Sequence, residues 1–298
     1  MGRKDRLAEE IARLIEKNYS EFEKAALHSD TDSPVDAEYK LFNSLFSKEL
    51  NPKEIKSNII QEVVEELEKR NLPVFILNEK KNYDGIPISA LLNLSPEKKI
   101  EIEIKKPWRD LGMYNRKNVT IKGKVGGCLG IGMSKGEIIV DGDAEDYVGI
   151  CMKGGKIIVN GKVKDCAGCC MLGGEIWVNG DAGKDLGSFM EGGRIVVNGN
   201  AEEGIGDFMF GGEIWVKNLK IENLSSTYEI GIGNIYRGLP GKDFEPVRIF
   251  EILEKPREGY VFFYFDKREK GNFVDRATYV LTKVFEAYND IKSSENGE

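Results

Sequence analysis

The sequence has a single histidine, His28, among its 298 residues. Ser-His-Asp hydrolases and histidine-dependent acyltransferases need an imidazole beside the reacting group, so one isolated histidine argues against both classes. The chain also lacks any apolar run approaching the roughly eighteen residues of a membrane-spanning helix. Its first residues, MGRKDRLAEEIARLIEKNY, are charged throughout and do not read as a secretory signal. We therefore expect a cytoplasmic protein that does not enter a membrane.

An excess of basic residues is also absent, because 43 Lys and Arg stand against 50 Asp and Glu, for a net charge of −7. Nucleic-acid-binding domains depend on Lys and Arg at phosphates, so no nucleic-acid partner is expected. The glycine-rich stretches at 126–132 and 231–238 lack both the G-K-[ST] ending of a P-loop and a complete G-x-G-x-x-G. The glycines therefore need a structural explanation rather than a nucleotide.

The chain does contain a repeat. Three columns of glycine and one column of methionine recur every nineteen residues. The methionine column is Met133, Met152, Met171, Met190 and Met209. One glycine column is Gly123, Gly142, Gly161, Gly180 and Gly199, and the other two begin at Gly130 and Gly136. A fixed period across four columns indicates a solenoid, in which each unit stacks on the next.

Each repeat contains one short strand, such as EIIV at 137–140 or EIWV at 175–178. The second strand position is always isoleucine and the fourth always valine, so both point inward, since alternate residues share a face. One strand per unit, always in the same direction, predicts a parallel β-helix with coils about 4.8 Å apart. Parallel crossovers are overwhelmingly right-handed, so we expect a mainly β, right-handed parallel β-helix whose interior methionine fills.

The corner after each strand reads Asp-Gly or Asn-Gly, a pair that tolerates the positive φ of a tight turn. Three corner asparagines would stack and form a hydrogen-bonded amide ladder: Asn160, Asn179 and Asn198. The first strand position alternates in charge along the stack. Opposite charges on neighbouring coils contribute about 0.2–1 kcal/mol per pair.

The segments on either side do not share the period. Residues 1–97 read as a helical N-terminal domain, with a helix in RLAEEIARLIEKNY, a second from the capping pattern at Asn51-Pro52 to about Arg70, and a strand at 72–77. The β-helix occupies residues 98–220. Residues 221–298 read as an α+β C-terminal segment, with strands at 247–254 and 260–266 and a closing helix. Both flanks would cover the open ends of the solenoid.

The units GDAEDYVGICMKGGKIIVNG and GDAGKDLGSFMEGGRIVVNG resemble the GXGXG β-helix domain. That domain forms one of the subunits of formylmethanofuran dehydrogenase and the C-terminal part of the large subunit of glutamate synthase. The resemblance covers residues 99–220, and the regular spacing with M-x-G-G is closer to the formylmethanofuran type. It implies a non-catalytic β-helix that holds no cofactor and packs against parts that carry the metal-pterin, flavin or iron–sulfur clusters.

All five cysteines fall inside the repeat: Cys128, Cys151, Cys166, Cys169 and Cys170. Their odd number favours reduced thiols over disulfides. Cys151 and Cys170 share a column on adjacent coils, and Cys166 and Cys169 form a C-x-x-C, spacings compatible with a thiolate metal site. The first column continues as phenylalanine on later coils, which favours an apolar packing role and no metal.

Between the two inward strand positions lies a column that must face outward, which we call the outer column. It consists of Ile139, Ile158, Trp177, Val196 and Trp215. Water disfavours such a stripe, so either the flanking domains cover it or another protein does, and tryptophan at an interface is commonly a hot spot. The stacked pair Asp146 and Asp165 is followed by Lys184 in its column, which reads as a solvated ridge rather than a glycosidase carboxylate pair.

The sequence thus predicts a non-catalytic scaffold or assembly subunit of an archaeal-type oxidoreductase complex, partnered by other subunits or by a second copy. One alternative is a glutamate synthase-type GXGXG protein. Another is an enzyme with its active site in a cleft between the solenoid and a flanking domain. The candidate anion-binding residues for such a cleft are Arg237, Lys242 and Arg248.

Overall fold

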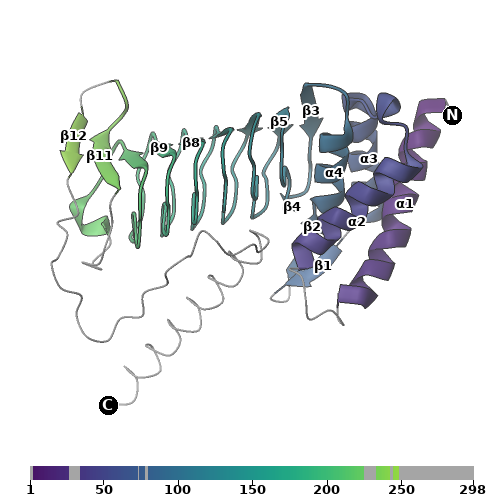
Figure 1. Cartoon of the computed structure of the whole chain (residues 1–298), viewed down its shortest axis with the longest axis horizontal. Coiled ribbons are helices and arrows are strands. Elements are labelled where there is room, and N and C mark those ends of the chain that lie inside the picture. Colours follow the sequence, from purple (N-terminus) through teal and green to yellow (C-terminus); the bar gives the residue numbers. More distant parts are fainter. Residues whose placement is uncertain are drawn as a thin grey trace, which may run out of the picture.

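The computed structural model describes residues 3–26, 34–72, 74–77, 80–224, 233–241 and 244–247. A helical head is followed by a long stack of parallel coils and a short antiparallel addition at the far end (Figure 1). The predicted fold class, a mainly β right-handed parallel β-helix with 19-residue coils, is confirmed. No helix within the described ranges is both long and apolar enough to cross a bilayer.

The coils contribute one strand each to a single sheet. The strands are β3 (Lys99–Glu103), β5 (Asn118–Lys122), β6 (Glu137–Asp141), β7 (Lys156–Val159), β8 (Glu175–Val178), β9 (Arg194–Val197) and β10 (Glu213–Val216). Neighbours in this order pair in parallel, and the register holds the nineteen-residue offset, so that Ile138 lies opposite Ile157 and Ile157 opposite Ile176. The repeat of the sequence is therefore the repeat of the coil.

The interior of the β-helix is built as the columns predict. The inward isoleucine and valine columns of the strands are at most 2% exposed, and each of the five methionines is 0% exposed. They belong to one core that continues into the head. Burial of apolar surface contributes about 25 cal/mol per Å², so these stacked columns stabilise the solenoid at every coil.

The corner glycines are needed for space, and here the sequence-based explanation was wrong. Gly142, Gly161, Gly180 and Gly199 do not have a positive φ, and of this column only Gly123 does. A Cβ on Gly161 would lie 2.6 Å from the carbonyl oxygen of Gly142 on the preceding coil. The coils approach each other too closely at this corner for any side chain, whatever the backbone angle.

The amide ladder at the same corner forms in part. Asn160 Nδ2 donates to Asp141 Oδ1 at 2.6 Å, and Asn179 Nδ2 donates to Asn160 Oδ1 at 2.8 Å. Within the described residues no side-chain hydrogen bond continues the ladder to Asn198. The ladder therefore links three successive coils rather than the whole stack.

The described residues of the head form four α-helices and a small sheet. The helices are α1 (Arg3–Ala26), α2 (Pro34–Glu49), α3 (Ser57–Arg70) and α4 (Ile86–Leu94), and the sheet joins β1 (Val74–Leu77), β2 (Lys80–Asp84) and β4 (Trp108–Arg109). The strand predicted at 72–77 is thus present as β1. Because β4 belongs to the first coil, the head and the solenoid share a sheet and a continuous core.

The second predicted helix begins later than expected. Asn51 does accept a hydrogen bond from the amide of Lys53, but it caps a single 3₁₀ turn, η1 (Pro52–Glu54). Helix α3 starts only at Ser57, whose amide and hydroxyl both donate to Glu97. It ends at Arg70 as predicted, with Asn71 in the left-handed conformation at its C-cap. Asn51 is therefore an N-cap as predicted, but of the 3₁₀ turn η1 rather than of α3.

The far end of the solenoid is extended by residues that do not show the repeat. After η2 (Ile221–Asn223), β11 (Asn234–Gly238) pairs in parallel with β10, and β12 (Phe244–Val247) pairs antiparallel with β11. The antiparallel strand ends the parallel stacking. The strands expected at 247–254 and 260–266 and the closing helix lie outside the described residues, apart from Val247.

Candidate interaction surface

The outer column lies on the outside of the sheet, one residue per coil. Ile139 is opposite Ile158, and Trp177 lies between Ile158 and Val196 in the parallel register. Ile139, Ile158 and Trp177 are partly exposed, whereas Val196 is 1% exposed. We call the three partly exposed residues the docking surface.

Trp215, the last residue of the outer column, is covered by the chain itself. Its ring stacks on Tyr236 of β11 with centroids 3.9 Å apart and an interplanar angle of 17°, and the residue is only 7% exposed. Its indole nitrogen donates to Glu213 Oε2 at 3.2 Å. The sequence suggested five equivalent docking residues, but the structure leaves three of them available.

Trp177 is anchored within its own coil and the one before it. Its indole nitrogen donates to Glu175 Oε2 at 3.0 Å, and Lys156 Nζ on the preceding coil lies 4.9 Å from the ring centroid. Lys156 thus lies over the Trp177 ring and leaves less of the ring face open for stacking. Sugar rings stack on aromatic faces, so this geometry suits an apolar protein surface better than a polysaccharide.

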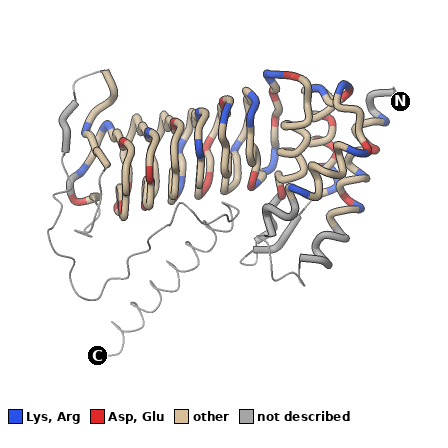
Figure 2. The backbone as a smooth tube through the Cα atoms, viewed as in Figure 1, with Lys and Arg blue, Asp and Glu red and all other residues tan. Residues whose placement is uncertain are grey.

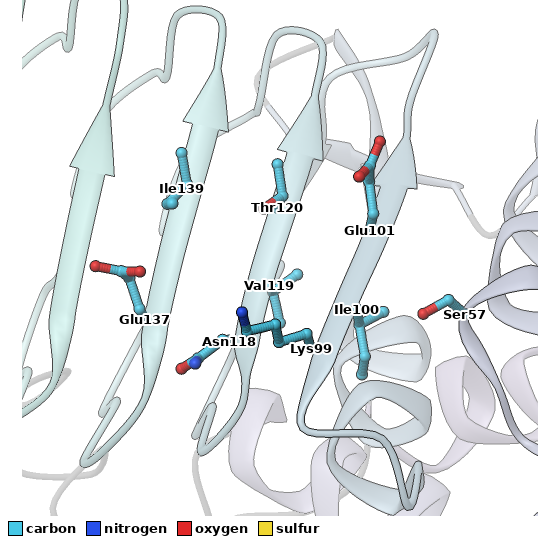
Figure 3. Close-up of a pocket in the computed structure, with 9 residues that line it drawn as sticks. All are labelled: Ser57, Lys99, Ile100, Glu101, Asn118, Val119, Thr120, Glu137 and Ile139. Atoms are coloured by element: carbon cyan, nitrogen blue, oxygen red, sulfur yellow. The ribbon is translucent and has the colours of Figure 1, made fainter.

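The docking surface continues into a hollow of about 380 Å³ beside the head. The hollow lies between the first turn of α3 and the outer faces of β3, β5 and β6, with Ser57 at one side and Ile139 at the other (Figure 3). Figure 3 shows Glu101, Thr120 and Ile139 in a row on neighbouring strands, so the column becomes polar as it approaches α3. The head therefore borders one end of the outer column, as β11 borders the other.

The charges along the rim of this face are paired with one another. Arg194 lies between Glu175 and Glu213, at nitrogen–oxygen distances of 3.7 and 2.8 Å, and Lys156 lies 3.9 Å from Glu175. This confirms the predicted charge alternation. Basic and acidic residues alternate along the coils rather than collecting on one side (Figure 2). A partner for this face needs apolar side chains more than a large charge of one sign.

A second outward face carries the cysteines, and we call it the left-handed face. Two columns there have non-glycine residues with φ between +49° and +64°. One column contains Cys128, Tyr147, Cys166 and Asp185, and the other contains Cys151, Cys170, Phe189 and Phe208. Side chains are costly in this conformation, at about 1 kcal/mol or more each, and the sequence reasoning did not foresee it.

The Cys151 column lies outside the solenoid interior. Cys151 is 1% exposed but packs in a separate cluster with Met113, Ile131 and Ile150, closed by Ile86 of the head. The phenylalanines of the column, Phe189 and Phe208, stack with centroids 5.0 Å apart. Across the described ranges, no three His, Cys, Asp or Glu side chains converge as a metal site would require.

A buried polar cluster joins the head to the first coils, and we call it the junction cluster: Asp84, Arg109, Asp110 and Cys128. Asp84 is 2% and Asp110 6% exposed. Burial, followed by the charge of Asp84, raises the pKa of Asp110 to about 7, against the opposing effect of Arg109. Burial also raises the pKa of the Cys128 thiol, whose sulfur lies 3.3 Å from Arg109 Nη2.

Sequence reasoning missed the junction cluster, although a signal was present. The pair Leu111-Gly112 matches Leu129-Gly130 at a spacing of eighteen residues, one short of the period. Asp110, directly before the first pair, therefore takes the same place in the coil as Cys128, and both have a positive φ. The pattern could therefore have revealed a charged residue at the head end of this column.

The other candidate residues are not brought together. Arg237 Nε donates to the carbonyl oxygen of Leu219 at 3.1 Å, while Lys242, Arg248 and His28 lie outside the described residues. The acidic column is engaged with its neighbours, since Asp165 Oδ1 accepts from the amide of Lys184 at 2.9 Å. That engagement suits a solvated ridge rather than a catalytic carboxylate pair.

Comparison with protein-family models, with characterised proteins and with solved structures gives no match for this chain. The resemblance to the GXGXG domain therefore rests on the repeat units alone. The class of protein that fold and surface define is a parallel β-helix capped by a helical head, with a short apolar docking surface on its strand face.

Proposed function

We propose that the protein is a non-catalytic scaffold or assembly subunit of an oxidoreductase complex, of the kind its GXGXG-like repeats suggest. The observation that carries the proposal is the docking surface of Ile139, Ile158 and Trp177, on a sheet whose ends are bordered by the chain's own head and β11. A rigid sheet that presents apolar side chains at intervals of about 4.8 Å is well suited to hold another protein in register.

The cleanest test is Trp177→Asp in the full chain. Trp215 is a poor target, since it is buried under Tyr236 and its replacement would disturb the end of the fold. Loss of a central tryptophan from an interface commonly costs at least about 2 kcal/mol, or roughly thirty-fold in affinity. We therefore expect the redox-enzyme subunits that purify with the native chain to be lost from the Trp177→Asp variant.

Phe210→Asp is the matched control, because Phe210 is 39% exposed on the coil after the Phe189 coil and lies outside the strand face. It removes a comparable apolar side chain without touching the docking surface. If both variants retain the same partners as the native chain, or both lose them, docking through Trp177 is wrong. Circular dichroism of both variants verifies that the fold survives.

A second candidate function is an enzyme with its site at the junction between head and solenoid. The junction cluster favours it, because a carboxyl group that titrates near neutral pH beside an arginine suits general acid–base chemistry. The two hollows beside the head, however, are lined by residues of α3, β3, β5 and β6, and Asp110 is not among them. A small molecule retained against Asp110 in a crystal structure of the native protein would support this function, and a dry, fully packed junction would contradict it.

A further inference from the structure

The C-x-x-C of the left-handed face forms a closed turn. The amide of Cys169 donates to the carbonyl oxygen of Cys166 at 3.3 Å, and Gly168 within the turn has a φ of +71°. A four-residue turn of this kind brings its first and last Cα atoms within about 7 Å, and disulfides span about 4.4–6.8 Å between Cα atoms. The thiols of Cys166 and Cys169 are neighbours across this turn. Disulfide formation here requires little movement of the backbone.

The two thiols differ in their access to solvent. Cys166 is partly exposed, whereas Cys169 is 2% exposed and its sulfur lies 3.4 Å from the carbonyl oxygen of Asp185. Burial, and then the hydrogen bond with Cys166, raise the pKa of Cys169 well above its usual value. Cys166 is therefore the thiol that an external reagent reaches first, and Cys169 is the buried thiol that reacts second.

We propose that Cys166 and Cys169 form a thiol–disulfide exchange site that reacts reversibly with small cationic disulfides. The Cys166 thiolate attacks one sulfur of the small disulfide, whose S–S bond breaks and releases one thiol, leaving a mixed disulfide on Cys166. Cys169 then loses its proton and attacks the Cys166 sulfur, releasing the second thiol. The protein gives up two electrons and two protons, and the small disulfide takes them up to become two thiols.

The preference for a cationic disulfide follows from the neighbouring charges. Asp165 precedes Cys166 in the chain, and Asp185 occupies the same column on the next coil. The lysines of the two loops are both paired with glutamates, Lys164 with Glu145 at 3.3 Å and Lys184 with Glu203 at 2.5 Å. The entrance to Cys166 is therefore acidic, which attracts a cation and repels an anion over about one Debye length.

Ser188 supplies a further feature of the site. It occupies the position of Cys169 on the next coil, is 5% exposed, and its hydroxyl has no hydrogen-bond partner among the described residues. Buried hydroxyls are normally satisfied. A hydroxyl donor at this position can stabilise the Cys169 thiolate at the moment it attacks, so Ser188 is a positioning residue for the second step.

The other close thiol pair is less suited to a disulfide. The thiols of Cys151 and Cys170 are also neighbours, but they lie on adjacent parallel coils and leave the backbone in the same conformation. Their Cβ atoms are thus separated by about the coil spacing of 4.8 Å, wider than the roughly 3.8 Å of a relaxed disulfide. The turn pair closes more easily than the cross-coil pair.

The test uses the full, reduced chain equilibrated without oxygen in mixtures of cysteamine and its disulfide, cystamine. After acid quenching, alkylation and mass spectrometry, we expect two of the five thiols to be lost reversibly, with Cys170 still alkylated in the peptide that contains Cys166 and Cys169. Cys169→Ser should stop the reaction at a mixed disulfide on Cys166. Cys170→Ser should leave the loss of two thiols unchanged.

The rates supply the second part of the test. Each rate is divided by the rate of the unfolded chain with the same reagent. The normalised rate with cystamine should be on the order of five-fold higher than that with the anionic glutathione disulfide. This ratio should shrink as salt is added. Five thiols that stay alkylatable under oxidising conditions would overturn the proposal. So would a disulfide between Cys151 and Cys170, or equal normalised rates for both reagents at low salt.

Discussion

Replacing Gly130, which packs against Ile157, should destabilise the fold for two separate reasons, one conformational and one steric. Gly130 has a φ of +71°, and a Cβ at this position would lie 2.7 Å from Ile157 Cδ1 on the next coil. Gly130→Ala therefore adds a left-handed alanine, at about 1–2 kcal/mol, and an overpacked contact, at about 1–3 kcal/mol. We expect the variant to lose about 2–5 kcal/mol of unfolding free energy.

Ile157→Val removes the clashing atom and completes a double-mutant cycle. Every other atom near the added Cβ is at least 3.6 Å away, which is an ordinary contact distance. Ile157→Val alone should cost about 0.5–1.5 kcal/mol, and in its background Gly130→Ala should cost only the conformational share of about 1–2 kcal/mol. Urea unfolding of the four proteins measures the coupling. Strictly additive costs would refute the claim that the glycine makes room for the isoleucine.

Two further predictions concern charge. Because the pKa of Asp110 in the folded chain, about 7, lies above the ordinary value of 3.8, the folded state binds an extra proton between about pH 4 and pH 7. The unfolding free energy should therefore fall as pH rises through that window, by up to about 1.4 kcal/mol per pH unit. Asp110→Asn should flatten this dependence of unfolding free energy on pH. An unchanged slope in the variant would contradict the burial of Asp110 beside Asp84. Arg194→Ala, which removes the cation between Glu175 and Glu213, should cost about 0.5–1 kcal/mol at low salt and less at high salt, as measured by urea unfolding.

The sequence predicted the solenoid and its core because every coil repeats the same packing problem. Isoleucine recurs at the same strand position on successive coils, as in Ile138, Ile157 and Ile176, and this predicts that the position points inward. All three side chains are buried in the structure. The same stacking explains why the outer column could be placed on the outside before the structure was known.

The repeat pattern could not show the conformation of the loops. Cysteine, tyrosine and phenylalanine at left-handed positions contradict local propensity, so nothing in Tyr147 or Phe189 alone indicates a positive φ. Contacts between the repeat and the segments outside it could not be predicted either, because those segments lack the nineteen-residue period. The stacking of Tyr236 on Trp215 and the proximity of Asp84 to Asp110 are two such contacts.

The central claim is that another protein covers the docking surface, and footprinting of Trp177 tests it most directly. The chain has three tryptophans, of which Trp108 and Trp215 are 0% and 7% exposed. Hydroxyl-radical labelling of the isolated chain should oxidise Trp177 far faster than those two. In the native assembly, labelling of Trp177 should fall several-fold while Phe210 stays as reactive as before. Trp177 that is already protected in the isolated chain, or that remains equally reactive in the assembly, would contradict docking at this surface.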